Sequence, residues 1–92
     1  MIKSFKHKGL WDFFNTGSLA GISPDHKQKL QRILAVANSA TKPEDLNLPG
    51  FRLHRLEGEK KGRWSIRIDK NWRFIFRFDG QDIVDVDYDD YH

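Results

Sequence analysis

Two of the four histidines occupy positions where proton-transfer chemistry is possible. His54 lies among arginines in a segment of alternating character, and His92 directly follows the acidic and aromatic residues 88–91. Histidine has an unperturbed pKa of about 6.5, so a positioned imidazole can move protons near neutral pH. A histidine in the last position is usually disordered and inert, which keeps a purely structural interpretation of His92 open. We expect His7 and His26, which have polar neighbours, to be exposed surface residues.

Basic residues are concentrated between residues 52 and 77, where only three acidic residues accompany them. Arginine suits phosphate because its planar guanidinium donates two parallel hydrogen bonds. The alternative is that Arg73 and Arg77 form cross-strand pairs with aspartates of the last strand, worth about 0.2–1 kcal/mol per pair. We expect some of these arginines to be paired and at least one to be free for a ligand. The basic residues are Arg52, Arg55, Lys60, Lys61, Arg63, Arg67, Lys70, Arg73 and Arg77, and the aspartates are Asp85 and Asp87.

Motifs for metal or nucleotide chemistry are missing. The alternating aspartates of residues 85–89 superficially resemble a calcium loop, but that loop needs a Gly at its sixth position and a Glu at its twelfth, which the sequence does not supply. His54, Asp90 and His92 could together ligate a transition metal, yet no recognised spacing supports such a site. The sequence has no cysteine, no Gly-rich phosphate loop and no nucleophile elbow. We therefore expect chemistry without a metal or cofactor.

Length favours one small domain over residues 1–92, and its charge is unevenly distributed along the chain. The 92 residues suffice for a single core, to which twelve aromatic side chains contribute. Residues 1–78 hold all 16 Lys and Arg but only 7 acidic residues, a net charge of +9, whereas residues 79–92 hold six Asp and no cation. A basic body suits a partner such as RNA, or it is simply a solvated surface. With no signal peptide and no apolar run near the about 20 residues of a membrane helix, we expect a cytoplasmic protein.

Periodicity predicts two helices in the first half of the chain. Residues 2–6 alternate and predict a short strand. Apolar residues at helical spacing predict a short helix over 9–16 and a longer one from 24 to about 39, begun by Ser23-Pro24-Asp25. Residues 41–50 are expected to form a loop. The apolar positions are Leu10, Phe13 and Phe14 in the first helix and Leu30, Ile33, Leu34 and Ala37 in the second.

From residue 51 onward the period changes to two, which predicts strands over 51–56, 64–68, 72–78 and 83–88. The turns between them, including Asp79-Gly80, favour sequential hairpins and thus an antiparallel meander. The fold class is α+β, with a short N-terminal strand and two helices packed on one face of a small antiparallel sheet. The expected core face is Trp64, Ile66, Trp72, Phe74, Phe76, Val84 and Val86, and the expected open face is Arg67, Arg73, Arg77, Asp85 and Asp87.

Five fragments carry a resemblance to a known family. They are residues 1–10, Leu53-His54-x-Leu56-x-Gly58, Gly62-x-Trp64-Ser65-Ile66, Asn71-Trp72-Arg73 and Asp90-Tyr91-His92. Each fragment alone is weak, but five in this order at similar spacing are specific. Together they resemble the HigB-type toxins, plasmid-maintenance killer proteins of the RelE/ParE superfamily, and the match covers essentially the whole chain.

The resemblance implies a RelE-like α+β fold and a bacterial protein made beside a HigA-like helix-turn-helix antitoxin. A toxin-antitoxin complex of this kind binds operator DNA through the antitoxin. The resemblance further implies an endoribonuclease that cuts messenger RNA on the ribosome during translation. Such cutting needs no metal, because the 2′-hydroxyl of RNA is its own nucleophile, and it leaves a 2′,3′-cyclic phosphate and a 5′-hydroxyl.

The same resemblance implies a role for each active-site residue. Arg73 would stabilise the charge that develops on the phosphate. His54 and His92 are the candidate proton carriers, a role typically worth about 10²–10⁴-fold in rate. Asp90 would orient His92 or act as base, and Tyr91 would stack on a base or contact the phosphate. Further phosphate contacts are expected from Arg55, Lys60, Lys61, Arg67 and Arg77.

One position departs from the family pattern, and two other functions remain open. Glu57 stands where the family often has a lysine, and Lys60 or Lys61 of the adjacent turn are candidates to replace that charge. The first alternative function is a ParE-like gyrase inhibitor, since fold does not fix function. The second is a non-catalytic RNA-binding or regulatory module, for which the basic face would suffice.

Overall fold

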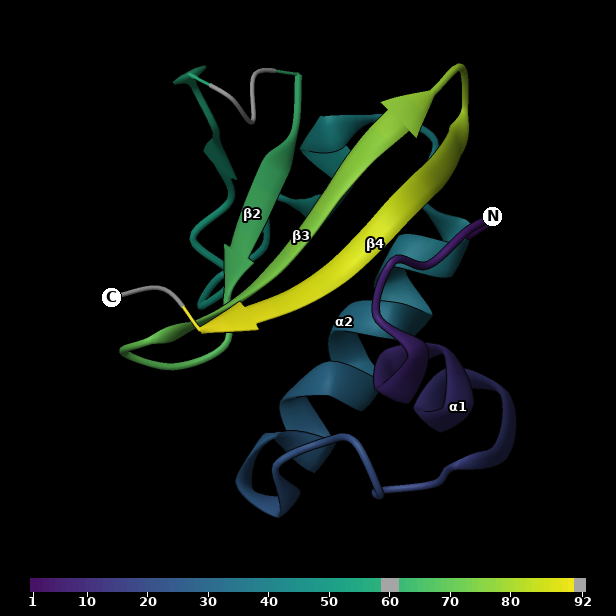
Figure 1. Ribbon diagram of the computed structural model, residues 1–92. Coiled ribbons are helices and arrows are strands. Elements are labelled where there is room, and N and C mark those ends of the chain that lie inside the picture. The colour runs from purple at the N-terminus through teal and green to yellow at the C-terminus, as the bar shows by residue number, and fades with distance from the viewer. Residues whose placement is uncertain (59–61, 91–92) are drawn as a thin grey trace.

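Two helices are followed by a four-stranded antiparallel meander (Figure 1). The computed structural model describes residues 1–58 and 62–90. The helices are α1 (Lys8–Thr16) and α2 (Lys27–Ser39), and two 3₁₀ turns, η1 (Pro24–His26) and η2 (Pro43–Leu46), flank α2. The strands, in spatial order, are β1 (His54–Arg55), β2 (Trp64–Arg67), β3 (Trp72–Asp79) and β4 (Asp82–Asp90).

The helix boundaries follow the sequence signals closely. The Nδ1 atom of His7 accepts a hydrogen bond from the backbone N–H of Leu10 at 3.0 Å, which caps the start of α1. Gly17, with a φ of 79°, ends that helix in the left-handed conformation. The helix predicted from residue 24 is a 3₁₀ turn continued by α2, and the side chain of Ser23 makes no capping bond. The prediction that His7 is exposed was wrong, because its capping role holds it half-buried.

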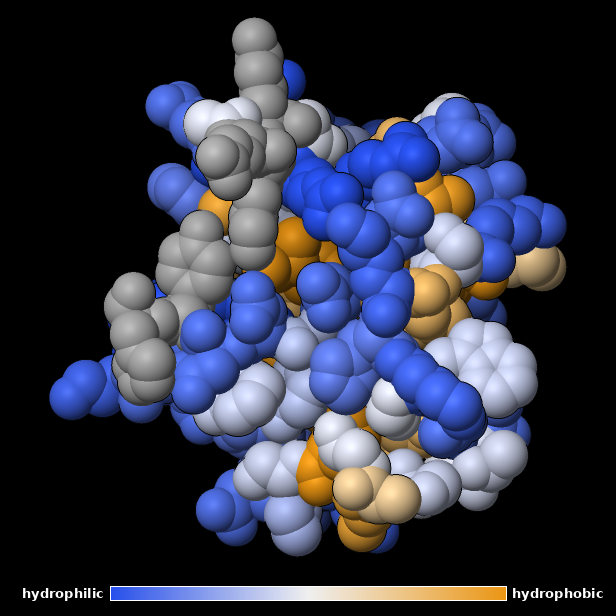
Figure 2. Space-filling view, in the orientation of Figure 1, coloured by the Kyte–Doolittle hydropathy of each residue, from blue (hydrophilic) through white to orange (hydrophobic). Residues whose placement is uncertain are grey.

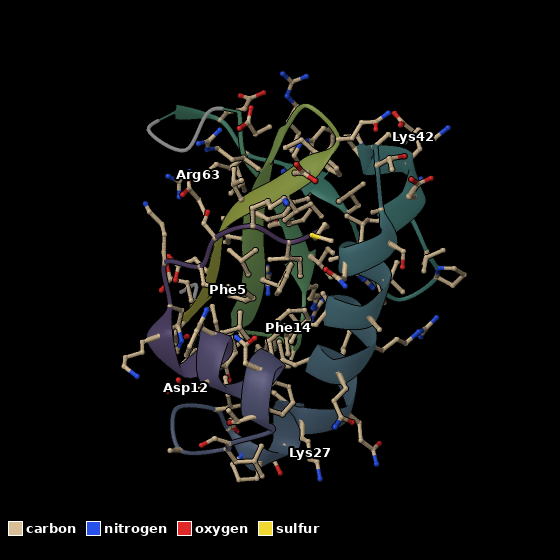
Figure 3. All side chains as sticks on the ribbon, turned by 90° about the vertical axis from the view of Figure 1, so that its right-hand side faces the viewer. Phe5, Asp12, Phe14, Lys27, Lys42 and Arg63 are labelled. Carbon is tan, nitrogen blue, oxygen red and sulfur yellow. The ribbon has the colours of Figure 1, made fainter. Side chains whose placement is uncertain are left out.

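The core lies between the helices and one face of the sheet (Figure 3). The apolar stripe of α2 and the side chains of Ile66, Phe74 and Phe76 are fully or almost fully buried, as their spacing predicts. Trp64 and Trp72, which begin β2 and β3, are only partly buried against this core. Burial of this apolar area is the main force that holds the helices on the sheet. The fully buried members include Leu30, Ile33, Ile66, Phe74 and Phe76.

A bulge in β4 reverses its alternation. Between the pairs Ile75–Asp87 and Arg77–Val84, β4 has one residue more than β3, and Asp85 adopts a φ of 54°. Ile83 is therefore fully buried in the core, whereas Val84 lies outside the core cluster. The prediction that Val84 faces the helices was wrong, because the alternating pattern does not reveal an extra residue.

The first residues run parallel to β4 without forming a strand. Lys3 N donates to Ile83 O at 2.8 Å and Val86 N donates to Ser4 O at 3.1 Å, but only two isolated bridges result. The predicted N-terminal strand is not confirmed, because the bulge at Asp85 lies between the two bridges and interrupts the ladder. Phe5 of this segment packs on Phe14 of α1, with ring centroids 5.5 Å apart (Figure 3).

The strand predicted over 51–56 is shortened to β1. Arg52 has a φ of 49°, which breaks the extended backbone, and Phe51 before it is fully buried. Pairing with β2 is limited to His54 opposite Ser65 and Arg55 opposite Trp64. The loop expected over 41–50 includes η2, whose Leu46 is buried in the core.

Candidate functional site

A cleft of ≈ 500 Å³ opens on the face of the sheet away from the helices. Hydrophilic side chains surround a small hydrophobic area over the middle of the sheet (Figure 2). The cleft thus combines a partly apolar floor with a basic rim, the arrangement expected of a site for a polyanion that has flat bases. Its lining residues are Arg52, Leu53, His54, Leu56, Ser65, Arg67 and Arg73.

Strand register brings the predicted residues to this cleft. His54 of β1 lies opposite Ser65 of β2, and two residues along β2, Arg67 lies opposite Arg73 of β3. Side chains two residues apart on a strand point to the same face. His54 therefore shares one open face with Arg67 and Arg73, which lie 13 and 19 positions later in the sequence, and Asp89 of β4 continues the row from Arg73.

The guanidinium of Arg73 is held by the turn between β2 and β3. Its Nη1 donates to the carbonyl oxygens of Asp69 at 2.9 Å and Trp72 at 3.1 Å. Within residues 1–58 and 62–90, all hydrogen bonds of the Arg73 side chain use Nη1. The rest of the guanidinium can therefore face a phosphate while the anchored nitrogen fixes its direction.

Arg67 shares the same anchor. Its Nε donates to the carbonyl oxygen of Asp69 at 3.2 Å. In the part of the chain that the structure describes, neither Arg67 nor Arg73 forms an ion pair with a carboxylate. Like charges directly opposite on neighbouring strands are destabilising, so this pair favours an anion between or above the two side chains.

Arg77 differs, because a carboxylate neutralises it. Its Nε donates to Asp85 Oδ2 at 2.6 Å, and this bond holds the pKa of the Asp85 carboxyl below its usual range. The predicted cross-strand pairing is thus confirmed for Arg77 and Asp85. The pairing does not extend to Asp87, which lies opposite Ile75.

Of the other predicted site residues, His54 lines the cleft, Arg55 and Asp90 lie outside its lining, and the rest lie beyond the described chain. His54, Arg55, Glu57 and Asp90 are exposed. The Arg55 guanidinium lies 5.8 Å from the ring centroid of Trp64, a cation–π contact. Asp90 ends β4 opposite Trp72, one position along from the row that contains Arg73. Lys60, Lys61, Tyr91 and His92 lie outside the described residues, so their roles stay predictions.

The family model for the RelE-like toxin HigB of type II toxin-antitoxin systems matches residues 3–92. The chain belongs to the HigB-like toxins. It is 39% identical to the Endoribonuclease HigB of Proteus vulgaris over 92 residues, which is the whole of both chains. It is 35% identical over 80 residues to Toxin HigB-1 of Vibrio cholerae serotype O1, which covers 85% of this chain and 84% of that relative. The family inferred from the five sequence fragments is confirmed.

Solved structures of other toxins share the fold of this HigB-like toxin. A chain of the heterotetrameric YoeB-YefM toxin-antitoxin complex from Staphylococcus aureus superposes with a TM-score of 0.65 at 15% identity, over 100% of this chain and 98% of that one. The YoeB/ParE toxin from Agrobacterium tumefaciens gives 0.58 at 19% identity, over 100% and 99%. These likenesses confirm the predicted α+β fold with both helices on one face of the sheet, and by themselves they do not decide activity.

A basic ridge joins Arg52 of the cleft to Lys29 and Arg32 of α2, and these two helix residues were not assigned a role from the sequence. Lys29 Nζ donates to the carbonyl oxygen of Gly50 at 3.0 Å, and the Arg32 guanidinium lies 5.2 Å from the ring centroid of Phe51. These contacts join the polar face of α2 to the loop before β1. The pKa of Lys29 is lowered, first by burial and then by the charges of Arg67, Arg32 and Arg52. The toxin therefore extends the positive cleft toward α2.

His26 was wrongly predicted to be exposed, since its side chain is only 6% exposed. Its Nδ1 lies 2.5 Å from Tyr88 Oη and its Nε2 lies 2.5 Å from Asp69 Oδ2. The hydrogen bond from His26 is the main cause that lowers the pKa of Asp69 to about 2. One signal could have revealed this burial, because His26 precedes Leu30 by four residues and so extends the apolar stripe of α2 by one turn.

Within residues 1–58 and 62–90, no three His, Asp or Glu side chains are grouped so that they could hold an ion. Among the same residues, no helix has the length and apolar character needed to cross a membrane.

Proposed function

We propose that this HigB-like toxin is an endoribonuclease that cuts messenger RNA on translating ribosomes and thereby arrests growth. The single observation that carries the proposal is the convergence of His54, Arg67 and Arg73 from three strands on one cleft. A relative 39% identical over the whole chain is named Endoribonuclease HigB. The arrangement supplies a proton-transfer group and two arginines that have no ion pair with a carboxylate among the described residues, as cleavage of a phosphodiester requires.

The chemistry follows from the substrate. The 2′-oxygen of one ribose attacks the adjacent phosphorus, the bond from phosphorus to the 5′-oxygen of the next nucleotide breaks, and one proton moves from the 2′-hydroxyl to that leaving oxygen. The product has a 2′,3′-cyclic phosphate and a 5′-hydroxyl. Negative charge gathers on the phosphate oxygens between these events, and anchored donors stabilise it without reorganising.

Each residue has a role in this scheme. Arg73 donates hydrogen bonds to the scissile phosphate, since its Nη1 is anchored to the turn and its strand points the side chain into the cleft. His54 and His92 carry the proton to and from the reacting oxygens. Asp90 orients His92 or acts as the base, and Tyr91 stacks on a base or contacts the phosphate.

The remaining cations bind the RNA on either side of the scissile phosphate. Arg55, Arg67, Arg77, Lys60 and Lys61 contribute from the sheet and its turn, and the basic ridge extends the track toward α2. Arg77 has the weakest claim among them, because its Nε already donates to Asp85. Glu57 is exposed in a separate pocket beside Arg55, where its charge opposes phosphate, so the positive charges of Lys60 and Lys61 become more important.

The partner of a type II toxin is an antitoxin. We propose a HigA-like helix-turn-helix antitoxin, through which the complex binds operator DNA. Cleavage of translated messages also places the toxin in the cytoplasm, and the proposed reaction needs no cofactor. One of the solved structures with this fold is a chain of a toxin-antitoxin complex.

The test is a cleavage assay on translating bacterial ribosomes, read by primer extension on one message. The expected result is discrete new cuts with wild-type toxin and their loss with Arg73→Ala. DNA supercoiling by gyrase, measured in parallel, tests the ParE-like alternative. Inhibited gyrase with intact messages would replace the proposal by that alternative, and RNA binding with neither effect would replace it by a non-catalytic module.

A further inference from the structure

Asp69 connects the core side of the sheet to the open face. Its Oδ1 accepts hydrogen bonds from the backbone N–H groups of Asn71 and Trp72, both at 2.9 Å. Its Oδ2 lies 2.5 Å from His26 Nε2. Its backbone carbonyl oxygen accepts from Arg67 and Arg73 on the other side. The side chain therefore fixes the turn between β2 and β3, and the carbonyl of that turn holds both arginines of the cleft.

The hydrogen bonds around His26 run in one direction. The backbone N–H of Ser23 donates to Tyr88 Oη at 3.4 Å, and burial raises the pKa of Tyr88, so the phenol keeps its proton. The Asp69 carboxylate only accepts, so Nε2–H of His26 donates to it, and in the neutral imidazole Nδ1 then accepts from the Tyr88 hydroxyl. The rings of Trp72 and Tyr88 pack edge-on against the imidazole, with centroids 5.7 and 5.8 Å away. Packing and both hydrogen bonds thus fix one orientation of His26.

Without the hydrogen bond from His26, the Asp69 carboxylate is held less firmly in the turn. Its side chain is 46% exposed, so water can replace the protein as its partner. The N–H groups of Asn71 and Trp72 would then lose their acceptor, and the direction of the Asp69 carbonyl would no longer be set. The guanidinium of Arg73 sits on a long flexible side chain, whose direction depends on that carbonyl.

We propose that His26 is a positioning residue for RNA cleavage, which acts through Asp69 on Arg73. His26 belongs to the opposite face of the sheet, so it does not touch the substrate. The inference rests on the proposed function, since it assigns Arg73 to the phosphate. Misplacement of a catalytic group by about 1 Å costs up to about 10²-fold in rate, which gives the expected scale of the effect.

Three variants separate positioning from general stability. His26→Leu removes both hydrogen bonds, His26→Gln keeps a donor for Asp69, and Tyr88→Phe removes only the hydroxyl that precedes the imidazole in the network. We expect His26→Leu to lower kcat about 10–100-fold with little change in KM, and His26→Gln to recover much of that loss. Tyr88→Phe should cleave nearly as fast as wild type, although it also removes a buried hydrogen bond. Equal losses of rate in the Leu and Phe variants, in proportion to their losses of thermal stability, would overturn the proposal.

A double-mutant cycle tests whether the effect passes through Arg73. In the background of Arg73→Lys, the anchored guanidinium is gone and His26→Leu should change the remaining rate less than threefold. An undiminished effect of His26→Leu in that background would show that His26 acts by another route and would contradict the proposal.

The closing experiment does not depend on cleavage. Nitrogen-15 NMR of the Arg73 guanidinium reports how fast the Nη1 group rotates about its bond to Cζ. We expect slow rotation in wild type and Tyr88→Phe, faster rotation in His26→Leu, and slow rotation again in His26→Gln. Unchanged slow rotation in folded His26→Leu would overturn the inference even if the toxin cuts RNA. Fast rotation in His26→Leu would support the positioning role even if the wild-type toxin never cuts RNA. The missing cleavage would then refute only the proposed function. If His26→Leu does not fold, His26→Gln is compared with wild type at pH 7. Fast rotation of the Arg73 guanidinium in folded His26→Gln would contradict the proposal, because this variant keeps the donor to Asp69.

Discussion

Arg67 and Arg73 lie directly opposite each other on β2 and β3 and donate to the same acceptor, the carbonyl oxygen of Asp69, at 3.2 and 2.9 Å. Two cations held side by side, without a carboxylate partner among the described residues, form a site that an anion would stabilise. The two arginines flank the hairpin turn between β2 and β3, so the strand register and the turn together bring both side chains to one acceptor. This pair is the feature of the open face that suits an anion.

Replacement of Arg73 by Ala should abolish cleavage while the domain stays folded. Loss of one donor to the developing charge typically costs about 10²–10³-fold in rate, and a half-buried side chain on the open face contributes little to the core. Primer extension on a translated message measures the cuts, and thermal unfolding measures stability. Lys42→Ala, which removes a charge outside the cleft, is the control and should cleave normally. If a folded Arg73→Ala variant cleaves at the wild-type rate, Arg67 would be the next candidate to stabilise the charge on the phosphate.

Removal of His92 should strongly reduce cleavage and leave ribosome binding intact. Proton transfer occurs in the transition state, so its loss lowers kcat without weakening ground-state binding. His54→Gln is the companion variant, because the exposed imidazole of His54 lines the cleft. Circular dichroism should report an unchanged fold for both variants. If the protein without His92 cuts as fast as wild type, His54, Asp90 or a group of the ribosome must carry the proton instead.

The sequence predicted most of the fold because its signals are local. Apolar spacing placed both helices within a few residues of their bounds, and Asp79-Gly80 marked the hairpin between β3 and β4. The errors in β1 and β4 share one cause, a non-glycine residue with positive φ. Arg52 shortens β1, and Asp85 creates the bulge in β4. Such backbone conformations depend on tertiary contacts that periodicity does not report.

The site was predicted as a set of residue types but not as a network. Alternation on one strand and the family resemblance brought His54 and Arg73 into consideration, and the structure places both at one cleft. The anchoring carbonyl of Asp69 could not be predicted, because it depends on the conformation of a turn. The burial of His26 was missed because its polar neighbours outweighed its spacing from Leu30. Long-range pairs such as His26 with Tyr88 require the fold itself.

The bulge in β4 predicts unequal costs for two adjacent substitutions. Ile83 is fully buried in the core, so Ile83→Ala should lower the free energy of unfolding by about 2–5 kcal/mol through lost burial and a cavity. Val84 lies outside the core cluster at 9% exposure, and Val84→Ala should cost clearly less. Urea unfolding of the two variants measures both values. The opposite order would mean that β4 keeps the simple alternation expected from the sequence.

Asp69 should make the stability of the toxin sensitive to strong acid. Its pKa is about 2 in the folded state, below its ordinary value of 3.8. A carboxyl whose pKa is lower when folded stabilises the fold above the unfolded pKa, and this contribution is lost as pH falls from about 4 toward 2. The pKa values of the Asp45 and Asp85 carboxyls are also lowered, so their contributions to stability also fall as the pH drops below their ordinary value of 3.8. Urea unfolding of wild type and Asp69→Asn isolates the effect, since the difference between them should be present at pH 7 and shrink near pH 2. A difference that stays constant with pH would contradict the assigned hydrogen bonds.

The basic ridge should contribute to RNA affinity through charge alone. Lys29 and Arg32 lie on α2, beyond the lining of the cleft, so Lys29→Gln and Arg32→Gln should weaken binding of an uncleavable 2′-deoxy analogue at low salt and leave kcat nearly unchanged. Each phosphate contact that is lost should reduce the slope of log affinity against log salt by about 0.7 for a single strand. Arg32→Gln also removes the cation–π contact with Phe51, so Arg32→Lys is the matched control that keeps the charge. An unchanged salt slope in Lys29→Gln and Arg32→Gln would show that the ridge is a solvated surface, and the RNA would then follow the sheet toward Arg55.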